Sequence, residues 1–153
     1  MTSEERAELV SRYRLGGRAL VETLSRLPEG SLDGAPGEDD WTPRMIAHHA
    51  ADAELVGGAR LRRLIAEDSP QLAAYDQERY ARELHYDRPL GASLALISAL
   101  TESNADLLER LNDEEWTRSG LHEERGPYTP ETWLSVYAGH CQEHAEQAAR
   151  SLS

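Results

Sequence analysis

The sequence is poor in cysteine and in positive charge, and it has no lysine and no phenylalanine. Its single cysteine, Cys141, cannot form a disulfide within the chain, so nothing here requires an oxidising compartment. The formal net charge of −12 argues against nucleic acid and anionic membranes as partners, because both are recognised by basic patches. All sixteen basic residues are arginine, a composition associated with GC-rich bacterial genes that indicates no function by itself.

Long apolar runs are also absent. No segment has the roughly 20 consecutive apolar residues of a transmembrane helix, and residues 1–17 contain no apolar run of the signal-peptide type. We therefore expect a cytoplasmic protein. Its 153 residues suit one domain, over residues 1–153, with small molecules, a metal ion or a second copy of the chain as partners.

Four segments have the periodicity of amphipathic helices: residues 4–27, 41–68, 90–111 and 128–152. Thr42 and Thr129, each followed by proline, are typical N-caps. Residues 28–40 read as a linker, residues 69–89 as a long crossover connection, and residues 112–128 as irregular. Because no run of residues indicates a strand, the sequence predicts an all-α four-helix bundle with its long crossover between the second and third helices.

Histidines occupy unusual positions on two of these helices. His140 and His144, in the stretch "HCQEH", lie within roughly 30° of the centre of the apolar stripe on the last helix. Ionisable groups in a core face must hydrogen-bond or bind a ligand, because otherwise they cost free energy. On the second helix, the same geometry directs His48 to solvent and places His49 at the edge that faces a neighbouring helix.

Three neutral imidazoles from two facing helices would suit a divalent ion of the zinc, nickel or iron type. They would leave coordination positions open for water or substrate. The alternative is that His140 and His144 only pack or hydrogen-bond, as many pairs at this spacing do. The zinc-protease motif is disfavoured, because it needs a glutamate directly after the first histidine and Cys141 stands there.

The same residues carry a family resemblance. "WTPRMIAHHAADAE" resembles the start of the second helix in the DinB-like superfamily, with Trp41, Ile46, His49 and Asp52 matching its pattern. "GPYTPETWLSVYAGHCQEH" resembles the last helix of that family, which carries a His-x-x-x-His pair. The resemblance implies an up-down-down-up bundle with a metal at one end, bound by the three histidines His49, His140 and His144.

Several activities occur in that family. Its best understood members are transferases that activate a small cellular thiol, such as bacillithiol or mycothiol, and many others are described only as metal-dependent hydrolases. Our leading expectation is a metal-dependent S-transferase that activates a low-molecular-weight thiol for attack on a small electrophile. The alternatives are a hydrolase that uses water, for which Glu143 is an open candidate base, and a non-catalytic bundle that dimerises around a structural metal or none.

Other residues have a functional and a structural interpretation side by side. Asp52 could orient a histidine ligand or be a solvated acid. Arg60 could hold a substrate carboxylate or phosphate, or pair with one of the many glutamates. Trp133 and Tyr137 could line a substrate pocket or belong to the core, and Cys141 is better explained as a small packed residue than as a nucleophile or ligand.

Two predictions concern the loops. Tyr75 and Tyr80, in the crossover, could cover the site. His85 and His122 lie in polar loops, so we expect both to be solvated.

Overall fold

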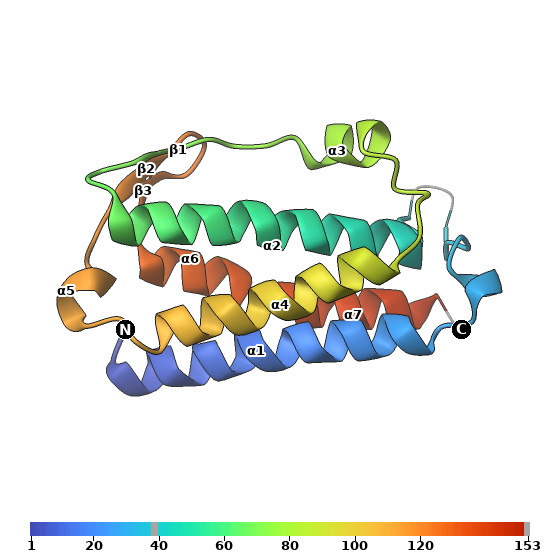
Figure 1. Ribbon diagram of the computed structural model, residues 1–153, viewed down its shortest axis with the longest axis horizontal. Helices are drawn as coiled ribbons and strands as arrows, with labels where there is room; N and C mark the ends of the chain where they lie inside the picture. The colour runs from blue at the N-terminus through green and yellow to red at the C-terminus, as the bar shows by residue number, and fades with distance from the viewer. Residues whose placement is uncertain (38–39, 152–153) are drawn as a thin grey trace.

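Four long helices form a bundle in the computed structural model, which describes residues 1–37 and 40–151. They are α1 (Ser3–Arg26), α2 (Pro43–Ala66), α4 (Gly91–Leu108) and a last helix in two parts, α6 (Pro130–Tyr137) and α7 (His140–Arg150). Figure 1 shows α2 and α4 running in one direction and α1, α6 and α7 in the other. This up-down-down-up order confirms the predicted fold class.

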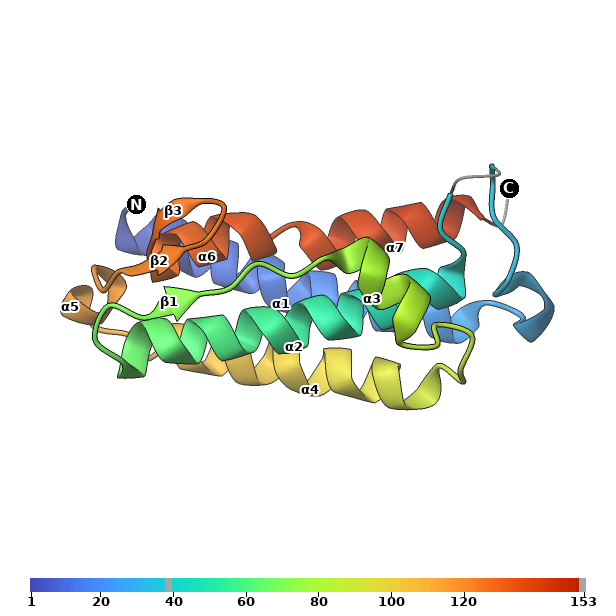
Figure 2. The same cartoon turned by 90° about the horizontal axis from the view of Figure 1, so that it is seen from above.

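The connections contain more structure than the sequence indicated. Between α2 and α4 lie β1 (Gln71–Leu72) and α3 (Gln77–Glu83), and Figure 2 shows this crossover passing over α2 on the side of α6 and α7. Between α4 and α6 lie α5 (Asp113–Trp116), β2 (Gly120–His122) and β3 (Gly126–Tyr128). A 3-10 turn, η1 (Glu29–Ser31), opens the linker after α1; residues 38 and 39 of that linker, and the predicted end of the last helix at residue 152, fall outside the described residues.

The three strands form one small sheet, in the order β1-β2-β3. β1 runs parallel to β2, and β2 is antiparallel to β3, with Gly120 opposite Tyr128. The expectation that the chain has no strand was therefore wrong. Strands of two or three residues are too short to show an alternating pattern, so only their pairing across the fold reveals them.

Both Thr-Pro helix starts have the predicted caps. The Thr42 hydroxyl accepts a hydrogen bond from the N–H of Met45, and the Thr129 hydroxyl accepts one from the N–H of Thr132, each at 3.2 Å. These bonds satisfy amide groups that have no partner within the first turn. The caps fix where α2 and α6 begin, and so fix which residues of each helix face the core.

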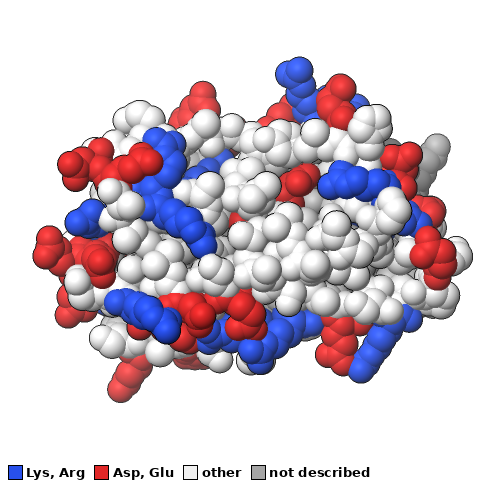
Figure 3. All heavy atoms as spheres, in the orientation of Figure 1, with Lys and Arg blue, Asp and Glu red and all other residues white. Residues whose placement is uncertain are grey.

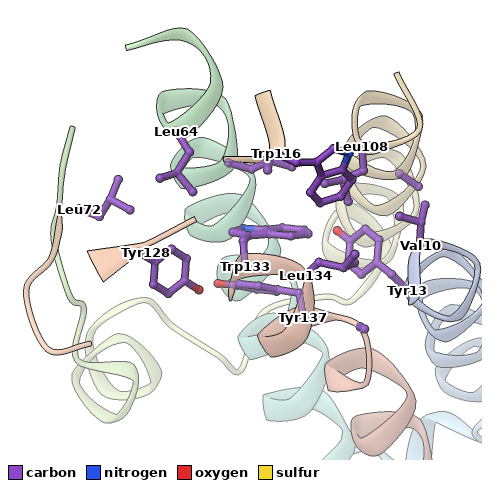
Figure 4. Packing of buried hydrophobic residues seen from close by; sticks show 13 residues of the cluster. Val10, Tyr13, Leu64, Leu72, Leu108, Trp116, Tyr128, Trp133, Leu134 and Tyr137 are labelled. Carbon is purple, nitrogen blue, oxygen red and sulfur yellow. The ribbon is translucent and has the colours of Figure 1, made fainter. Parts of the chain in front are cut away.

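An aromatic cluster joins α6 to α1 and α2, as Figure 4 shows. Trp133 and Tyr137 stack with ring centroids 4.5 Å apart, and the indole N–H of Trp133 donates to the carbonyl of Gly57 at 2.7 Å. A Cβ atom on Gly57 would lie only 2.4–2.7 Å from atoms of Tyr137. Gly57 is therefore needed for α6 to pack this closely on α2.

The last helix is interrupted, although the sequence predicted one continuous helix. α6 ends at Tyr137, residues 138–139 form a turn, and α7 begins at His140 with Gly139 as its N-cap. Glycine is a common site of such breaks, because it has little helix preference. The break starts a new helix directly at the first histidine of "HCQEH".

Charged side chains of both signs are interspersed over the face of the molecule in Figure 3. Between α1 and α4, Arg14 pairs with Glu102, Asp106 and Glu109, and Arg18 pairs with Glu102. Such exposed pairs contribute little each, but as a network they hold the two helices in register. Within the described residues, no helix combines the length and the apolar character needed to cross a bilayer.

Candidate metal centre

The fold brings His49 of α2 together with His140 and His144 of α7. The ring centroids lie 4.5 Å apart for His140 and His144, 4.9 Å for His49 and His144, and 5.5 Å for His49 and His140. One candidate ligand atom from each ring lies within 4.8 Å of the other two. Three imidazoles that converge in this way are a potential ligand set for a single metal ion.

Hydrogen bonding prepares one of these rings for coordination. Nδ1 of His144 lies 2.9 Å from the side-chain oxygen of Gln147, so the Nδ1–H group donates there and leaves a lone pair on Nε2. Nε2 of His144 lies 3.1 Å from Nε2 of His140. Two nitrogens that each bind an ion at about 2.0–2.1 Å would be this far apart if the angle at the ion were about 100°, which is close to tetrahedral.

Burial keeps the cluster uncharged. It lowers the pKa of His49 to about 4 and that of His140 to about 3, with smaller contributions from neighbouring histidines, and it also lowers the pKa of His144. Neutral imidazole is the form that binds metal ions. Nδ1 of both His49 and His140 is buried without a hydrogen-bond partner. A neutral three-histidine cluster in which His49 makes no hydrogen bond to a described residue fits a divalent transition metal, which would give that ring a partner.

A cavity of about 850 Å³ adjoins the cluster. His49 and His140 lie on its wall together with Tyr137, while Arg60 and Tyr75 contribute further wall residues from α2 and the crossover. Trp41 packs edge-on against His49, with ring centroids 4.6 Å apart. Two of the three metal-binding candidates thus face a space large enough for a small-molecule substrate.

A family model described as "DinB superfamily" matches residues 12–148. The chain belongs to the DinB superfamily. This confirms the family resemblance of the two histidine-bearing helix starts.

Two proteins from one bacterium are similar in sequence to this DinB-superfamily chain over most of its length. It is 32% identical over 83% of its length to the protein named "Putative metal-dependent hydrolase OB0782" of Oceanobacillus iheyensis, and covers 74% of that protein. It is 26% identical over its whole length to "Putative metal-dependent hydrolase OB0413" of the same organism, and covers 88% of it.

A solved structure shows the same fold. It is YfiT from Bacillus subtilis, described as "a probable metal-dependent hydrolase with an unusual four-helix bundle topology". The superposition has a TM-score of 0.90 and covers 99% of this chain and 87% of that one, at 22% sequence identity.

The other predicted site residues of this DinB-superfamily protein fall into two groups. Arg60 and Tyr137 line the cavity. Trp133 is fully buried behind Tyr137 in the core and does not line the cavity. Asp52 accepts a hydrogen bond from the hydroxyl of Tyr86 at 2.6 Å rather than one from His49, so the structure does not bring it to the histidine cluster.

The loop tyrosines and Cys141 can be placed as well. Tyr75 lines the cavity, and Tyr80 packs against it with ring centroids 4.7 Å apart. Cys141 is buried, in agreement with the prediction of a packed residue. His85 is exposed, as predicted.

Two predictions of solvated histidines were wrong. His48 is fully buried, between the Ser93 hydroxyl at 2.7 Å and the Arg88 carbonyl at 2.9 Å. The helical wheel assumed that one face of α2 meets water, but α4 and the end of the crossover cover that face. His122 is 4% exposed, because it lies on β2 of the small sheet that the sequence did not predict.

Glu54 is a buried polar residue that sequence reasoning missed. It is fully buried, and its carboxyl group accepts hydrogen bonds from the Tyr13 hydroxyl and from Sγ of Cys141, the latter at 3.3 Å. Burial raises the pKa of Glu54 to about 7. Glu54 follows Ala50 by four residues and precedes Leu61 by seven, so its position on the apolar stripe was a readable signal.

Glu54 lies directly behind the metal candidates. Single ligand atoms of Glu54, His140 and Cys141 lie within 4.8 Å of one another. The Tyr13 hydroxyl in turn accepts a hydrogen bond from Asn104 at 3.0 Å. A polar network of α1, α2, α4 and α7 therefore supports the inner side of the site, away from the cavity.

Proposed function

We propose that this protein is a metal-dependent enzyme that acts on a small molecule. His49, His140 and His144 would hold a divalent transition-metal ion such as zinc, nickel or iron. One observation carries this proposal: three neutral imidazoles converge beside a cavity, and the group contains no fourth protein ligand among the described residues. Catalytic sites have this arrangement, whereas structural zinc sites are usually closed by four protein ligands.

The residues around the cluster have defined tasks in such a site. A divalent ion held there would lower the pKa of a water molecule or thiol that ligates it, and so supply a nucleophile near neutral pH. Gln147 fixes the orientation of His144 through its hydrogen bond to Nδ1. Trp41 and Tyr137 pack edge-on against His49 and His140, so two of the ligand candidates are held in place by aromatic neighbours.

Hydrolysis is the first candidate reaction. Its support is that relatives of 32% and 26% identity carry the name metal-dependent hydrolase. Glu143, left open above as a base, is exposed and does not line the cavity. A hydrolytic mechanism would therefore depend on the ion, rather than on Glu143, to generate the nucleophile.

Transfer to a low-molecular-weight thiol is the second candidate. The observation that favours it is the size of the cavity, about 850 Å³, which is near the upper end of ordinary ligand pockets. A space of this size accommodates a thiol co-substrate and a small electrophile together. Hydrolysis needs room for only one organic substrate.

Metal content is the first test. Protein purified without a metal-affinity tag is analysed for bound elements, beside a His140→Ala, His144→Ala double variant. We expect close to one equivalent of a transition metal in the wild type and none in the variant. A wild-type protein that also fails to bind added zinc, nickel and iron would contradict the proposal.

A second assay, on metal-loaded protein, distinguishes hydrolysis from transfer to a thiol. Hydrolysis of activated esters without added thiol would support the hydrolase, and metal-dependent consumption of a thiol with an aryl halide would support the transferase. Neither activity over a broad panel, with the metal bound, would favour the non-catalytic alternative. Sedimentation of the same samples would test whether two copies of the chain associate, the third partner considered above.

A further inference from the structure

Among the described arginines, only Arg60 has a buried side-chain nitrogen without a hydrogen-bond partner. One guanidinium nitrogen, Nη2, donates to the carbonyl of Ala73 at 2.5 Å, and the guanidinium lies over the ring of Tyr75. Nε is buried and has no hydrogen-bond partner. Although the sequence has 28 acidic residues, no described carboxylate pairs with this side chain.

Arg63 provides a direct contrast one helical turn further along α2. It also donates to a carbonyl of the crossover, that of Gln71 at 2.7 Å, but it is paired with Glu67 at 3.0 Å. Arg63 does not line the cavity, whereas Arg60 does. Of these two neighbouring arginines, the one on the cavity wall is therefore the one without a carboxylate partner among the described residues.

The surroundings of Arg60 offer a second donor and aromatic walls. Nδ1 of His122 accepts the N–H groups of Glu124 and Arg125, at 3.2 and 3.3 Å, so the proton of the neutral ring is on Nε2. His122 stacks with Tyr128, and both line the cavity with Arg60. Figure 4 shows the hydroxyl of Tyr128 turned toward Tyr137, another cavity residue.

The separation between Arg60 and the histidines sets a minimum length for a ligand that contacts both. It follows His49 by eleven residues, so the two positions are about 16 Å apart along α2 and on nearly the same face. His49 and Arg60 both line the cavity, so the histidine cluster and the guanidinium lie at different positions along one continuous space. A molecule that contacts both must be elongated.

We infer that Arg60, with His122 beside it, forms a subsite for the carboxylate of an elongated substrate whose reacting group lies at the three histidines. Guanidinium groups recognise carboxylates through paired N–H donors, and flat aromatic neighbours suit a planar anion. A carboxylate is favoured over a phosphate, because Asp76, Glu123 and Glu124 outnumber Arg125 among the other charged residues of the cavity wall and would repel a dianion more strongly. The location of the reacting group rests on the proposed function; the carboxylate subsite does not.

The subsite is tested on metal-free protein by NMR of the arginine Nε–H groups. Benzoate is titrated as the probe, with uncharged benzamide and inorganic phosphate as comparisons. We expect benzoate to shift the Arg60 signal saturably and to bind at least tenfold more tightly than either comparison. Arg60→Gln should weaken benzoate binding at least tenfold, while Arg63→Gln, the matched control, should leave it unchanged.

Other results would overturn the inference. A benzoate titration that leaves the Arg60 signal unmoved, or one that is equally strong in Arg60→Gln, would show that the carboxylate does not bind there. Tighter binding of phosphate than of benzoate would contradict the assigned ligand class. Because no metal is present, none of these results depends on whether the histidines bind an ion.

Zinc-loaded protein then tests the link between the two ends of the cavity. Straight-chain ω-mercaptocarboxylates of increasing length are compared with ω-mercaptoalcohols of the same length by calorimetry. We expect an advantage of at least tenfold for the acid only once its chain spans the distance between these ends, and loss of that advantage in Arg60→Gln. An advantage independent of length would refute simultaneous contact; failure of all thiols to bind zinc-loaded protein would instead count against the proposed thiol chemistry.

Discussion

His48 and His49 are neighbours in the chain and both are buried, yet their surroundings differ. His48 has a hydrogen-bond partner at each ring nitrogen, the hydroxyl of Ser93 and the carbonyl of Arg88. His49 has no hydrogen bond to any described residue, its Nδ1 is buried, and it faces two further histidines across the helix interface. One helix therefore presents a satisfied histidine on one side and an unsatisfied one on the other.

The presence or absence of hydrogen-bond partners distinguishes a structural histidine from a ligand-binding one better than burial does. A buried polar group with all its partners contributes to the fold, and it gains nothing by binding an ion. A buried group without partners carries a free-energy cost that a ligand can remove. The Glu54 network resembles His48 in this respect, because its carboxyl group has partners from both neighbouring helices.

The largest effect that the comparison predicts is on metal binding. His49→Ala should lower metal affinity by more than about 100-fold, which exceeds the usual effect of changing a residue that only supports a ligand. His48→Ala is the matched control and should keep the metal stoichiometry of the wild type. Competition with a chromophoric chelator measures both; equal losses in the two variants would remove the distinction.

The second prediction concerns the stability of the metal-free protein in acid. His49 and His140 have folded-state pKa values of about 4 and about 3, whereas the unfolded chain takes up protons near the ordinary value of 6.5. Stability should therefore be fully present above about pH 6.5 and fall as the pH is lowered toward 4, by up to about 1.4 kcal/mol per pH unit for each histidine. Urea unfolding at a series of pH values measures this slope.

Glu54 has the opposite effect on stability between about pH 4.5 and pH 7: it favours the folded state as the pH falls. Because its folded-state pKa is raised to about 7, its contribution is most favourable below about pH 4.5 and is lost as the pH rises to 7. Glu54→Gln should therefore steepen the loss of stability on acidification. A slope that is unchanged in His49→Gln would show that His49 is not the source of the acid sensitivity.

A smaller effect is expected at His48 itself. His48→Ala leaves the Arg88 carbonyl and the Ser93 hydroxyl without their buried partner, which should cost about 1–3 kcal/mol of unfolding free energy. Denaturant titration of the metal-free protein measures this change. Ser93→Ala, which removes only one of the two bonds, should cost less, and a neutral His48→Ala would contradict the structural assignment.

The smallest effect is predicted at Asp52. Its carboxylate contacts Tyr86 and not the histidine cluster, so Asp52→Asn should change metal affinity by less than about threefold, below the loss seen when a supporting residue of a ligand is changed. Tyr86→Phe serves as the control for the lost hydrogen bond. A tenfold loss of metal in Asp52→Asn alone would restore the role first considered for this residue.

Much of the architecture could be predicted from local patterns. The Thr-Pro starts at Thr42 and Thr129 define the phase of two helices, and apolar spacing defines their buried faces. Because the sequence gives the start and the buried face of each helix, it could predict that His49, His140 and His144 lie near one another. Helical periodicity is a local property, so it can be read one segment at a time.

Other features depend on contacts between segments distant in the chain. The burial of His48 requires Ser93 and Arg88 from another helix and a loop, and the placement of His122 requires strands of two or three residues to pair. Whether Arg60 meets an anion or stays unpaired depends on which acidic residues the crossover brings near it. A helical wheel treats one face of α2 as solvent, but packing in three dimensions surrounds the helix, and that difference is the reason why His48 was wrongly predicted to be solvated.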